Sequence, residues 1–195
     1  MTTQNAPTIR RDVLPLHIEP LQGEARARTQ ADFERAHPHP FLVYTRSKLW
    51  DRTLLVALEE TEGTAETRVA RYEMYEGGMS FVHPIKKAQT DPKHPGIVLG
   101  RAASQDLVVP VASVSSAHVA FIPPRPGSPA WMVSDLGSKN GTWLEEDPLP
   151  AREARAIGDG KYLRLGGNLI AWFFGSARLW ELLKDPAALR RYTEV

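Results

Sequence analysis

Side chains suited to binding an anion occur in three short segments near the middle of the chain. Arg101 follows an apolar run, and Lys139 precedes an Asn-Gly pair. Two hydroxyl residues, Ser115 and Ser116, lie between them. A guanidinium offers a planar fork of N–H donors, an ammonium offers a compact charge, and hydroxyls add further donors. Because a phosphate monoester is close to a dianion with three acceptor oxygens, this donor set fits a phosphate group.

Each of these residues is commonplace when taken alone. A strand-end arginine is usually solvated, loop serines usually bond the local backbone, and Asn140-Gly141 is typical of a hairpin turn. The joint order and spacing are more specific. In the sequence, 13 residues separate Arg101 from Ser115, and His118 follows Ser115 by three. A further 19 residues separate His118 from Ser138.

Together the segments resemble the forkhead-associated (FHA) domain. The shared pattern is Gly100-Arg101, Ser-x-x-His at 115–118 and Ser-x-Asn-Gly-Thr at 138–142, followed by Gly158-Asp159 and a strand ending in Gly166. The resemblance covers roughly residues 79–175, about half of the chain. It implies the family's fold, an eleven-stranded β-sandwich whose loops at one end bind phosphothreonine peptides.

The resemblance also implies the roles of individual residues. The phosphopeptide-binding side chains would be Arg101, Ser115, Ser116, Lys139 and Asn140. The residues supporting the site would be Gly100, His118, Ser138, Gly141 and Thr142. In this family Arg101 and Ser115 would bind the phosphate, Asn140 would hold the peptide backbone, and His118 would brace the loops through hydrogen bonds. The sequence departs from the family after Thr142, where residues 143–148 are acidic and predict a longer turn.

Composition excludes several other classes of protein. The 195 residues include 24 Lys and Arg against 23 Asp and Glu, a net charge of +1 that gives no general attraction to nucleic acid or anionic membrane. The absence of cysteine excludes disulfides, thiolate metal sites and a cysteine nucleophile. The strongest apolar run, Leu169 to Phe174, has six residues where a membrane span needs about 20. We therefore expect a soluble, cytoplasmic protein.

Local patterns predict the elements around the site. Thr29 to Asp32 matches the capping box of a short helix, which the prolines at 38 and 40 would stop. Residues 41–45 are typical of a strand, and 49–60 favour a helix. Alternation over 69–85 around a Gly-Gly turn predicts a β-hairpin, and short strands then continue to residue 175. Ser176 and Asp185 are candidate helix caps near the C-terminus.

We therefore expect a mostly β protein in four parts. These are a flexible N-terminal arm (1–22), a mixed helix and strand extension (23–67), the FHA-like β-sandwich (68–175) and a C-terminal helix (176–195). No cofactor or metal is expected, since His37 and His39 lack a carboxylate cluster at ligand spacing and a helix stop explains them. A hydrolase is disfavoured because Ser115 and His118 share one loop without a nucleophile elbow or an acid partner.

Two functions remain open. The preferred one is a non-catalytic reader of phosphothreonine proteins in Ser/Thr kinase signalling. The alternative is a phosphate-independent scaffold or assembly protein that uses the FHA-like sandwich, its N-terminal extension and an apolar interface on the C-terminal helix. Because the donors at the phosphate-facing positions are retained, the reader is favoured.

Overall fold

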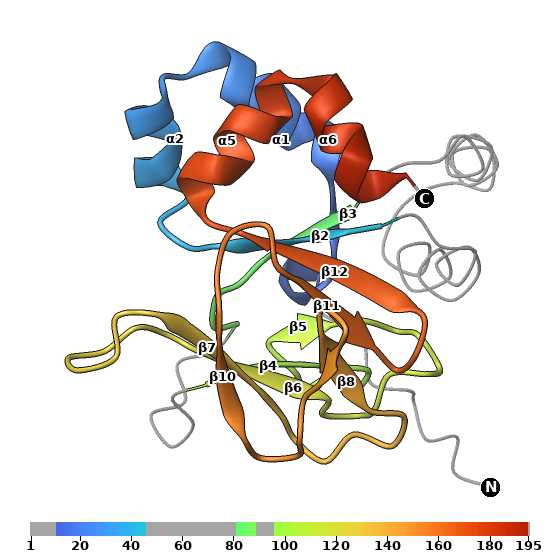
Figure 1. Ribbon diagram of the computed structural model, residues 1–195. Coiled ribbons are helices and arrows are strands. Elements are labelled where there is room, and N and C mark those ends of the chain that lie inside the picture. Colours follow the sequence, from blue (N-terminus) through green and yellow to red (C-terminus); the bar gives the residue numbers. More distant parts are fainter. Residues whose placement is uncertain (1–10, 46–80, 89–95, 195) are drawn as a thin grey trace, which may run out of the picture.

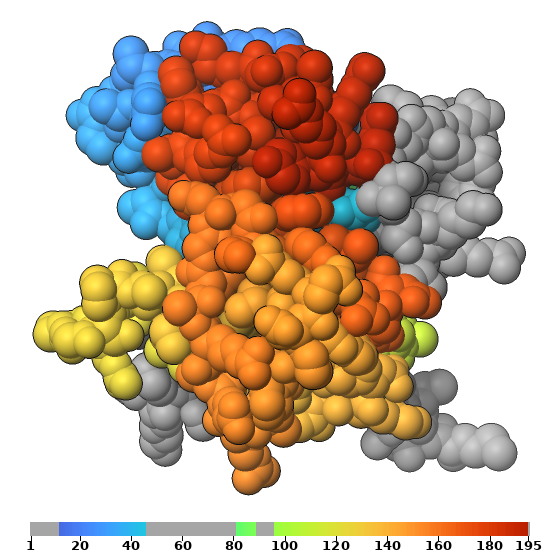
Figure 2. Space-filling view, in the orientation of Figure 1, coloured from blue at the N-terminus to red at the C-terminus, as the bar shows by residue number. Residues whose placement is uncertain are grey.

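Three stacked layers make up the protein in the computed structural model, which describes residues 11–45, 81–88 and 96–194 (Figure 1). Within these ranges the middle layer is a seven-stranded sheet, the lower layer is a five-stranded sheet, and helices cover the upper face. The two sheets confirm the predicted mostly β sandwich, and helices from both ends of the chain flank it. Figure 2 shows the helical layer resting on the sandwich.

The strand order places early and late parts of the chain in one sheet. The seven-stranded sheet runs β1 (Leu16–His17), β3 (Phe81–Pro84), β2 (Phe41–Tyr44), β12 (Leu169–Phe174), β11 (Tyr162–Leu165), β8 (Thr142–Leu144) and β9 (Asp147–Pro148). The five-stranded sheet runs β10 (Ala154–Ile157), β7 (Trp131–Asp135), β6 (Val119–Ile122), β4 (Ile97–Gly100) and β5 (Leu107–Val108). Neighbouring strands are antiparallel except β4 and β5, which are parallel.

Strand β2 shows why the middle sheet is apolar on both faces. Leu42 and Tyr44 belong to the core between the two sheets, whereas Phe41 and Val43 belong to a second core under the helices. Successive strand side chains point to opposite faces, so a strand between two apolar layers has no polar face. This explains the continuous apolar run in the sequence.

The helices close the second core. The helical segments are η1 (Arg11–Val13), α1 (Ile18–Ala27), α2 (Gln30–Ala36), α5 (Ser176–Lys184) and α6 (Pro186–Thr193). On α5, Leu179, Leu182 and Leu183 share one helix face and are buried in this core. The apolar face that the scaffold alternative needed is therefore covered by the chain itself.

The helix ends follow the predicted chemistry with one exception. The Thr29 side chain caps α2 by accepting a hydrogen bond from the Asp32 backbone, and the Asp185 side chain caps α6 ahead of Pro186. Ser176, predicted as a cap, is instead the first residue of α5, with Gly175 at the cap position. The Gly175 backbone N–H is bound by the Asp159 carboxylate, which supplies the negative group expected at a helix start.

The N-terminal part differs from the expected division. Val13 and Leu14 are buried in the sandwich core, β1 joins the sheet, and the expected boundary at residue 22 falls inside α1. The expectation of a flexible arm is wrong for residues 11–22, because apolar side chains of this segment pack against the sandwich. Likewise β2, placed in the extension by its position in the sequence, is an inner strand of the sheet. Residues 1–10, the helix expected at 49–60 and most of the hairpin expected at 69–85 lie outside the described residues.

A buried histidine, His83, is hydrogen-bonded on both ring nitrogens where η1 meets the middle sheet. The Tyr44 hydroxyl is 2.8 Å from His83 Nδ1, and His83 Nε2 is 3.0 Å from the Val13 carbonyl oxygen. Nε2 must carry the proton, because a carbonyl can only accept, and Nδ1 then accepts from the tyrosine. Burial lowers the pKa of His83 to about 3, so the imidazole is neutral in the folded protein.

Acid is therefore expected to destabilise the fold through His83. The unfolded imidazole binds a proton below about pH 6.5 and the buried one does not. The contribution to stability is complete above pH 6.5 and is lost as the pH falls toward 3, by up to about 1.4 kcal/mol per pH unit. Denaturant unfolding of the wild type and of His83→Gln between pH 7 and 4.5 checks this. Equal pH slopes in the two proteins would contradict it.

In the described ranges no helix is long and apolar enough to cross a membrane. Over the same ranges, no three His, Cys, Asp or Glu residues are grouped so that they could hold a metal ion.

Candidate functional site

The predicted site residues lie on three loops at one end of the sandwich, except Gly100 and Thr142, which are the strand residues next to these loops. The first loop (101–106) joins β4 to β5, the second (109–118) joins β5 to β6, and the third (136–141) joins β7 to β8. Because β6 is antiparallel to both β4 and β7, its first residue lies beside the last residues of those two strands. The sheet therefore brings together segments that are far apart in the sequence.

Hydrogen bonds tie the three loops to one another. The Arg101 backbone N–H donates to the Ser115 carbonyl at 2.8 Å. The Lys139 backbone N–H donates to Ser115 Oγ at 2.9 Å, and Asn140 Nδ2 donates to the Ser113 carbonyl at 2.9 Å. Ser115 thus contacts both flanking loops, and Arg101, Ser115 and Lys139 belong to one connected surface.

Gly100 makes this close approach possible. A Cβ at this position would lie 2.2 Å from the Ser116 carbonyl oxygen, far inside the normal contact distance. The Ala102 N–H also donates to the Ser116 carbonyl at 3.1 Å. Any larger residue at position 100 would push the first loop away from the second, which explains why a glycine precedes Arg101.

Arg101 and Lys139 supply positive charge at the surface. Both side chains are exposed. Arg101 Nε donates to the Val114 carbonyl at 3.2 Å, which holds the guanidinium against the second loop while its two terminal nitrogens stay available among the described residues. Over those residues no carboxylate lies within ion-pair distance of either cation, so an incoming anion need not displace one.

The two serines differ in their present contacts. Ser115 Oγ accepts a hydrogen bond from the Lys139 backbone, which leaves the hydroxyl proton free to point outward. Ser116 is exposed at the tip of the second loop, and its carbonyl is used by the first loop. The Ser115 side chain is thereby held by a hydrogen bond, whereas the Ser116 side chain makes none to the described residues.

His118 lies beneath the loops and is fully buried. Its Nδ1 accepts from the Ser115 backbone N–H at 2.9 Å, so Nε2 carries the proton and donates to the Gly141 carbonyl at 3.2 Å. Burial lowers the pKa of His118, which keeps the ring neutral and this tautomer in place. The imidazole thus links the second loop to the third and has no contact with solvent.

Asp135 was not among the predicted site residues, although it organises the third loop. Its carboxylate accepts hydrogen bonds from the backbone N–H groups of Gly137 and Ser138 at 2.7 and 2.8 Å. The hydroxyls of Ser138 and Thr142 donate to it at 2.6 and 2.5 Å. Burial alone would raise the pKa of Asp135, but these hydrogen bonds outweigh it and lower the pKa. Ser138 and Thr142 therefore face inward, and the signal in the sequence was an acid three residues before a serine.

Two glycines fix the turn around Asn140. Gly141 has φ of 77°, and its carbonyl accepts from both His118 Nε2 and the Gly166 N–H. Gly166 was missed as a supporting residue: a Cβ there would lie 2.3 Å from the Ser113 carbonyl oxygen. Of the Asn140-Gly141 pair, only Gly141 has a positive φ.

The acidic segment after Thr142 also differs from expectation. Strands β8 and β9 are joined by Glu145 and Glu146 alone, with Glu145 at φ of 57°. The predicted longer turn is therefore wrong, because a non-glycine residue accepts the left-handed conformation here. On β11, which pairs with β8, the Arg164 guanidinium lies 4.0 Å from the centre of the Trp143 ring.

Comparison with known proteins agrees with the resemblance of this segment. Residues 97–166 match the family model described as the FHA domain, a range that contains every predicted site residue. A search of curated proteins returned no match.

Several solved FHA domains are similar to part of the chain. The N-terminal FHA domain of S. cerevisiae Rad53p, solved with a phosphothreonine peptide, is 18% identical over 50% of this chain and 89% of that one, with a TM-score of 0.39. The MEK1 FHA domain, solved with a HOP1 phosphothreonine peptide, is 26% identical over 48% and 87%, with a TM-score of 0.38. The FHA domain of the CT664 protein from Chlamydia trachomatis is 14% identical over 69% and 96%, with a TM-score of 0.42.

Proposed function

We propose that the FHA domain matched over residues 97–166 makes this protein a non-catalytic binding module for phosphothreonine peptides. The single observation that carries the proposal is the joining of three loops through Ser115, which puts Arg101 and Lys139 on one surface. The two FHA structures with phosphothreonine peptides point to the same class of ligand.

The chemistry of the surface suits a phosphate. A phosphothreonine carries a charge of about −1.5 to −2 and three acceptor oxygens. We assign the Arg101 terminal nitrogens to two of these oxygens, because a planar fork binds phosphate in a bidentate manner. The Ser115 and Ser116 hydroxyls and the Lys139 ammonium supply the remaining donors. Among the described residues no carboxylate lies within ion-pair distance of Arg101 or Lys139, and the nearby Asp135 is turned inward by its four hydrogen bonds.

Asn140 is assigned to the peptide backbone. One of its amide N–H bonds is used on the Ser113 carbonyl, so the second N–H and Oδ1 are left for a ligand. A carboxamide can both donate to and accept from an extended peptide, which fits this position beside the phosphate. The contact to Ser113 would hold the amide in place before the peptide arrives.

Preorganised loops favour binding of a small, charged group. Association costs free energy for every side chain or loop that must be ordered, and His118, Asp135 and Gly100 order these loops in advance. The supporting residues would therefore contribute to affinity without touching the ligand.

The partner would be a protein phosphorylated on threonine by a Ser/Thr protein kinase, because that class of enzyme makes the modification. We place the protein in such signalling in the cytoplasm and assign it no cofactor, metal, nucleic acid or membrane partner. The net charge of +1 agrees with local recognition of one phosphate, since it gives no broad attraction to polyanions.

The alternative, a phosphate-independent scaffold, is disfavoured by the burial of Leu179, Leu182 and Leu183 within the chain. Screening the full chain against a library of degenerate phosphothreonine peptides and the same library without phosphate tests the proposal. Enrichment only among phosphorylated peptides is the expected result. Equal retention of the two libraries would favour the scaffold.

Lys139→Ala is expected to weaken phosphothreonine-peptide binding less than loss of Arg101, by about two- to fivefold. The ammonium is exposed on a flexible stem, and exposed ion pairs contribute about 0.2–1 kcal/mol. The difference from wild type should shrink as salt is raised from 50 to 500 mM, because salt screens exposed charges. Titrations at the two salt concentrations check this, with Lys161→Ala, which removes another exposed lysine, as the matched control. A loss that is independent of salt would contradict it.

A further inference from the structure

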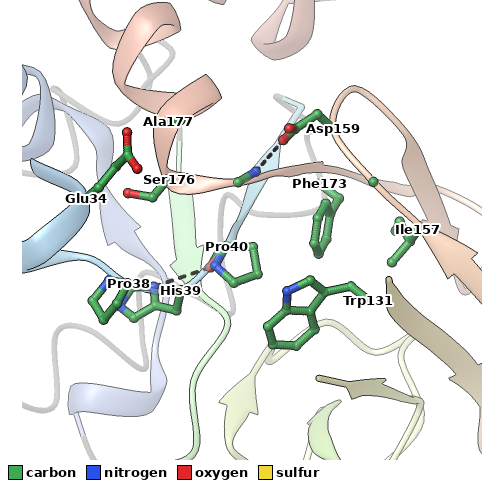
Figure 3. A pocket seen from close by; sticks show the side chains of 12 residues that line it. Glu34, Pro38, His39, Pro40, Trp131, Ile157, Asp159, Phe173, Ser176 and Ala177 are labelled. Atoms are coloured by element: carbon green, nitrogen blue, oxygen red, sulfur yellow. Dashed lines mark hydrogen bonds between the residues drawn. The ribbon is translucent and has the colours of Figure 1, made fainter. Parts of the chain in front are cut away.

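A cavity of about 540 Å³ lies at the other end of the sandwich, where the helical layer meets the two sheets (Figure 3). Its walls come from α2, the α2–β2 connection, the first residue of β7, the ends of β10 and β12, and the start of α5. Strand β7 runs from this cavity, at Trp131, to the phosphate-facing loops after Asp135. The cavity is thus separate from the proposed phosphopeptide site.

The charged groups at the cavity are predominantly negative. Glu34 and Asp159 line it from opposite sides, and the lining residues include no lysine or arginine. Burial lowers the pKa of His39, aided by the nearby charges of Lys86 and His37, so the ring adds no positive charge at neutral pH.

The partial positive charge at the N-terminus of α5 compensates only part of the negative charge of these two carboxylates. A helix start carries about half a positive charge, whereas two carboxylates carry two full negative charges. Asp159 already accepts a hydrogen bond from the Gly175 N–H at that helix start. The Glu34 carboxylate has no hydrogen bond among the described residues. The balance therefore favours a cation.

Aromatic rings form the opposite wall. Trp131 and Phe173 lie with ring centroids 6.3 Å apart and planes inclined at 55°. Figure 3 shows both rings on the side of the cavity away from Glu34 and Ser176. Such faces attract cations, and a guanidinium stacks on them better than an ammonium.

We propose that this cavity binds a guanidinium group, held by Glu34 and Asp159 and stacked on Trp131. The volume lies within the usual range of about 300–1,000 Å³ for ligand sites and has room for the alkyl chain that carries the group. The guanidinium belongs either to a small molecule or to an arginine side chain of a partner protein.

Nitrogen-15 NMR of the full chain tests the site, with the Trp131 indole signal assigned from Trp131→Phe. Butylguanidinium should shift this signal in a saturable manner, and neutral butylurea, which has the same shape, should not. No saturable shift with butylguanidinium, or an equal response to butylurea, would overturn the proposal. An acetylated tripeptide with a central arginine separates the sources: binding of the tripeptide assigns the site to a protein arginine, and binding of butylguanidinium alone assigns it to a small molecule.

Charge-removing variants identify the groups responsible. Glu34→Gln and Asp159→Asn should each weaken butylguanidinium about two- to fivefold, the range for partly exposed ion pairs. Glu34→Gln keeps the test decisive if Asp159→Asn disturbs the start of α5. Glu153→Gln, at the opposite end of β10, is the matched control and should leave the affinity for butylguanidinium unchanged. Arg101→Ala should also leave this affinity unchanged. Unchanged affinity in both Glu34→Gln and Asp159→Asn would overturn the assignment.

Discussion

Arg101→Ala is expected to reduce the affinity for a phosphothreonine peptide by at least about 30-fold, a loss of about 2 to 5 kcal/mol. That range is typical when one partner of a hydrogen-bonded charge pair that is buried in the complex is removed. The side chain has a single hydrogen bond within the described part of the protein, to the Val114 carbonyl, and it is exposed. The substitution should therefore leave the fold intact and act on binding alone.

Calorimetric titration with a peptide from the library screen measures the effect. Arg125→Ala is the matched control, because Arg125 is also an exposed loop arginine but lies between β6 and β7 at the other end of the sandwich. A change of less than threefold in Arg101→Ala, with the thermal midpoint unchanged, would remove Arg101 from the site.

His118→Ala is expected to lower stability and binding together. The substitution leaves the Ser115 N–H without its partner, and an unsatisfied buried group costs about 1–3 kcal/mol. The Gly141 carbonyl loses one of its two hydrogen bonds and keeps the one from the Gly166 N–H. The cavity left by the ring adds to this cost. At about 2–4 °C per kcal/mol for a chain of this size, the thermal midpoint should fall by roughly 5–15 °C.

Binding should weaken in the same variant even at temperatures where it is folded, because the second and third loops lose their link. Thermal unfolding and peptide titration at 10 °C measure the two effects separately. His37→Ala provides a control for removal of a partly buried histidine elsewhere. If the midpoint stayed unchanged while affinity vanished, His118 would have to be a direct ligand.

The location of the site could be predicted from the sequence because its residues are carried by turns with local signatures. Glycine before Arg101 and the Asn140-Gly141 pair mark positions where backbone approach or positive φ is needed, and the structure shows both at Gly100 and Gly141. The β-sandwich followed from short strands separated by such turns. These signals depend on neighbours in the chain, which a sequence displays directly.

The contacts that the sequence did not reveal are long-range. Gly166 is required because Ser113 lies against it, and that neighbour is 53 positions away in the chain. Residues 11–22 pack on the sandwich because strands from both halves of the chain form one sheet, which local periodicity does not show. Asp135 was overlooked because a strand-end carboxylate is usually solvated, and only its four hydrogen bonds distinguish it.

Dependence on the phosphate itself is the central claim, and one calorimetric comparison tests it most directly. The wild-type chain is titrated with the strongest library peptide and with the same peptide carrying unmodified threonine. We predict saturable 1:1 binding of the phosphorylated peptide and at least about 100-fold weaker binding of the unmodified one, since a charged hydrogen-bonded group contributes several kcal/mol. Equal affinity for the two peptides would contradict the account, and the three joined loops would then have to serve a phosphate-independent contact.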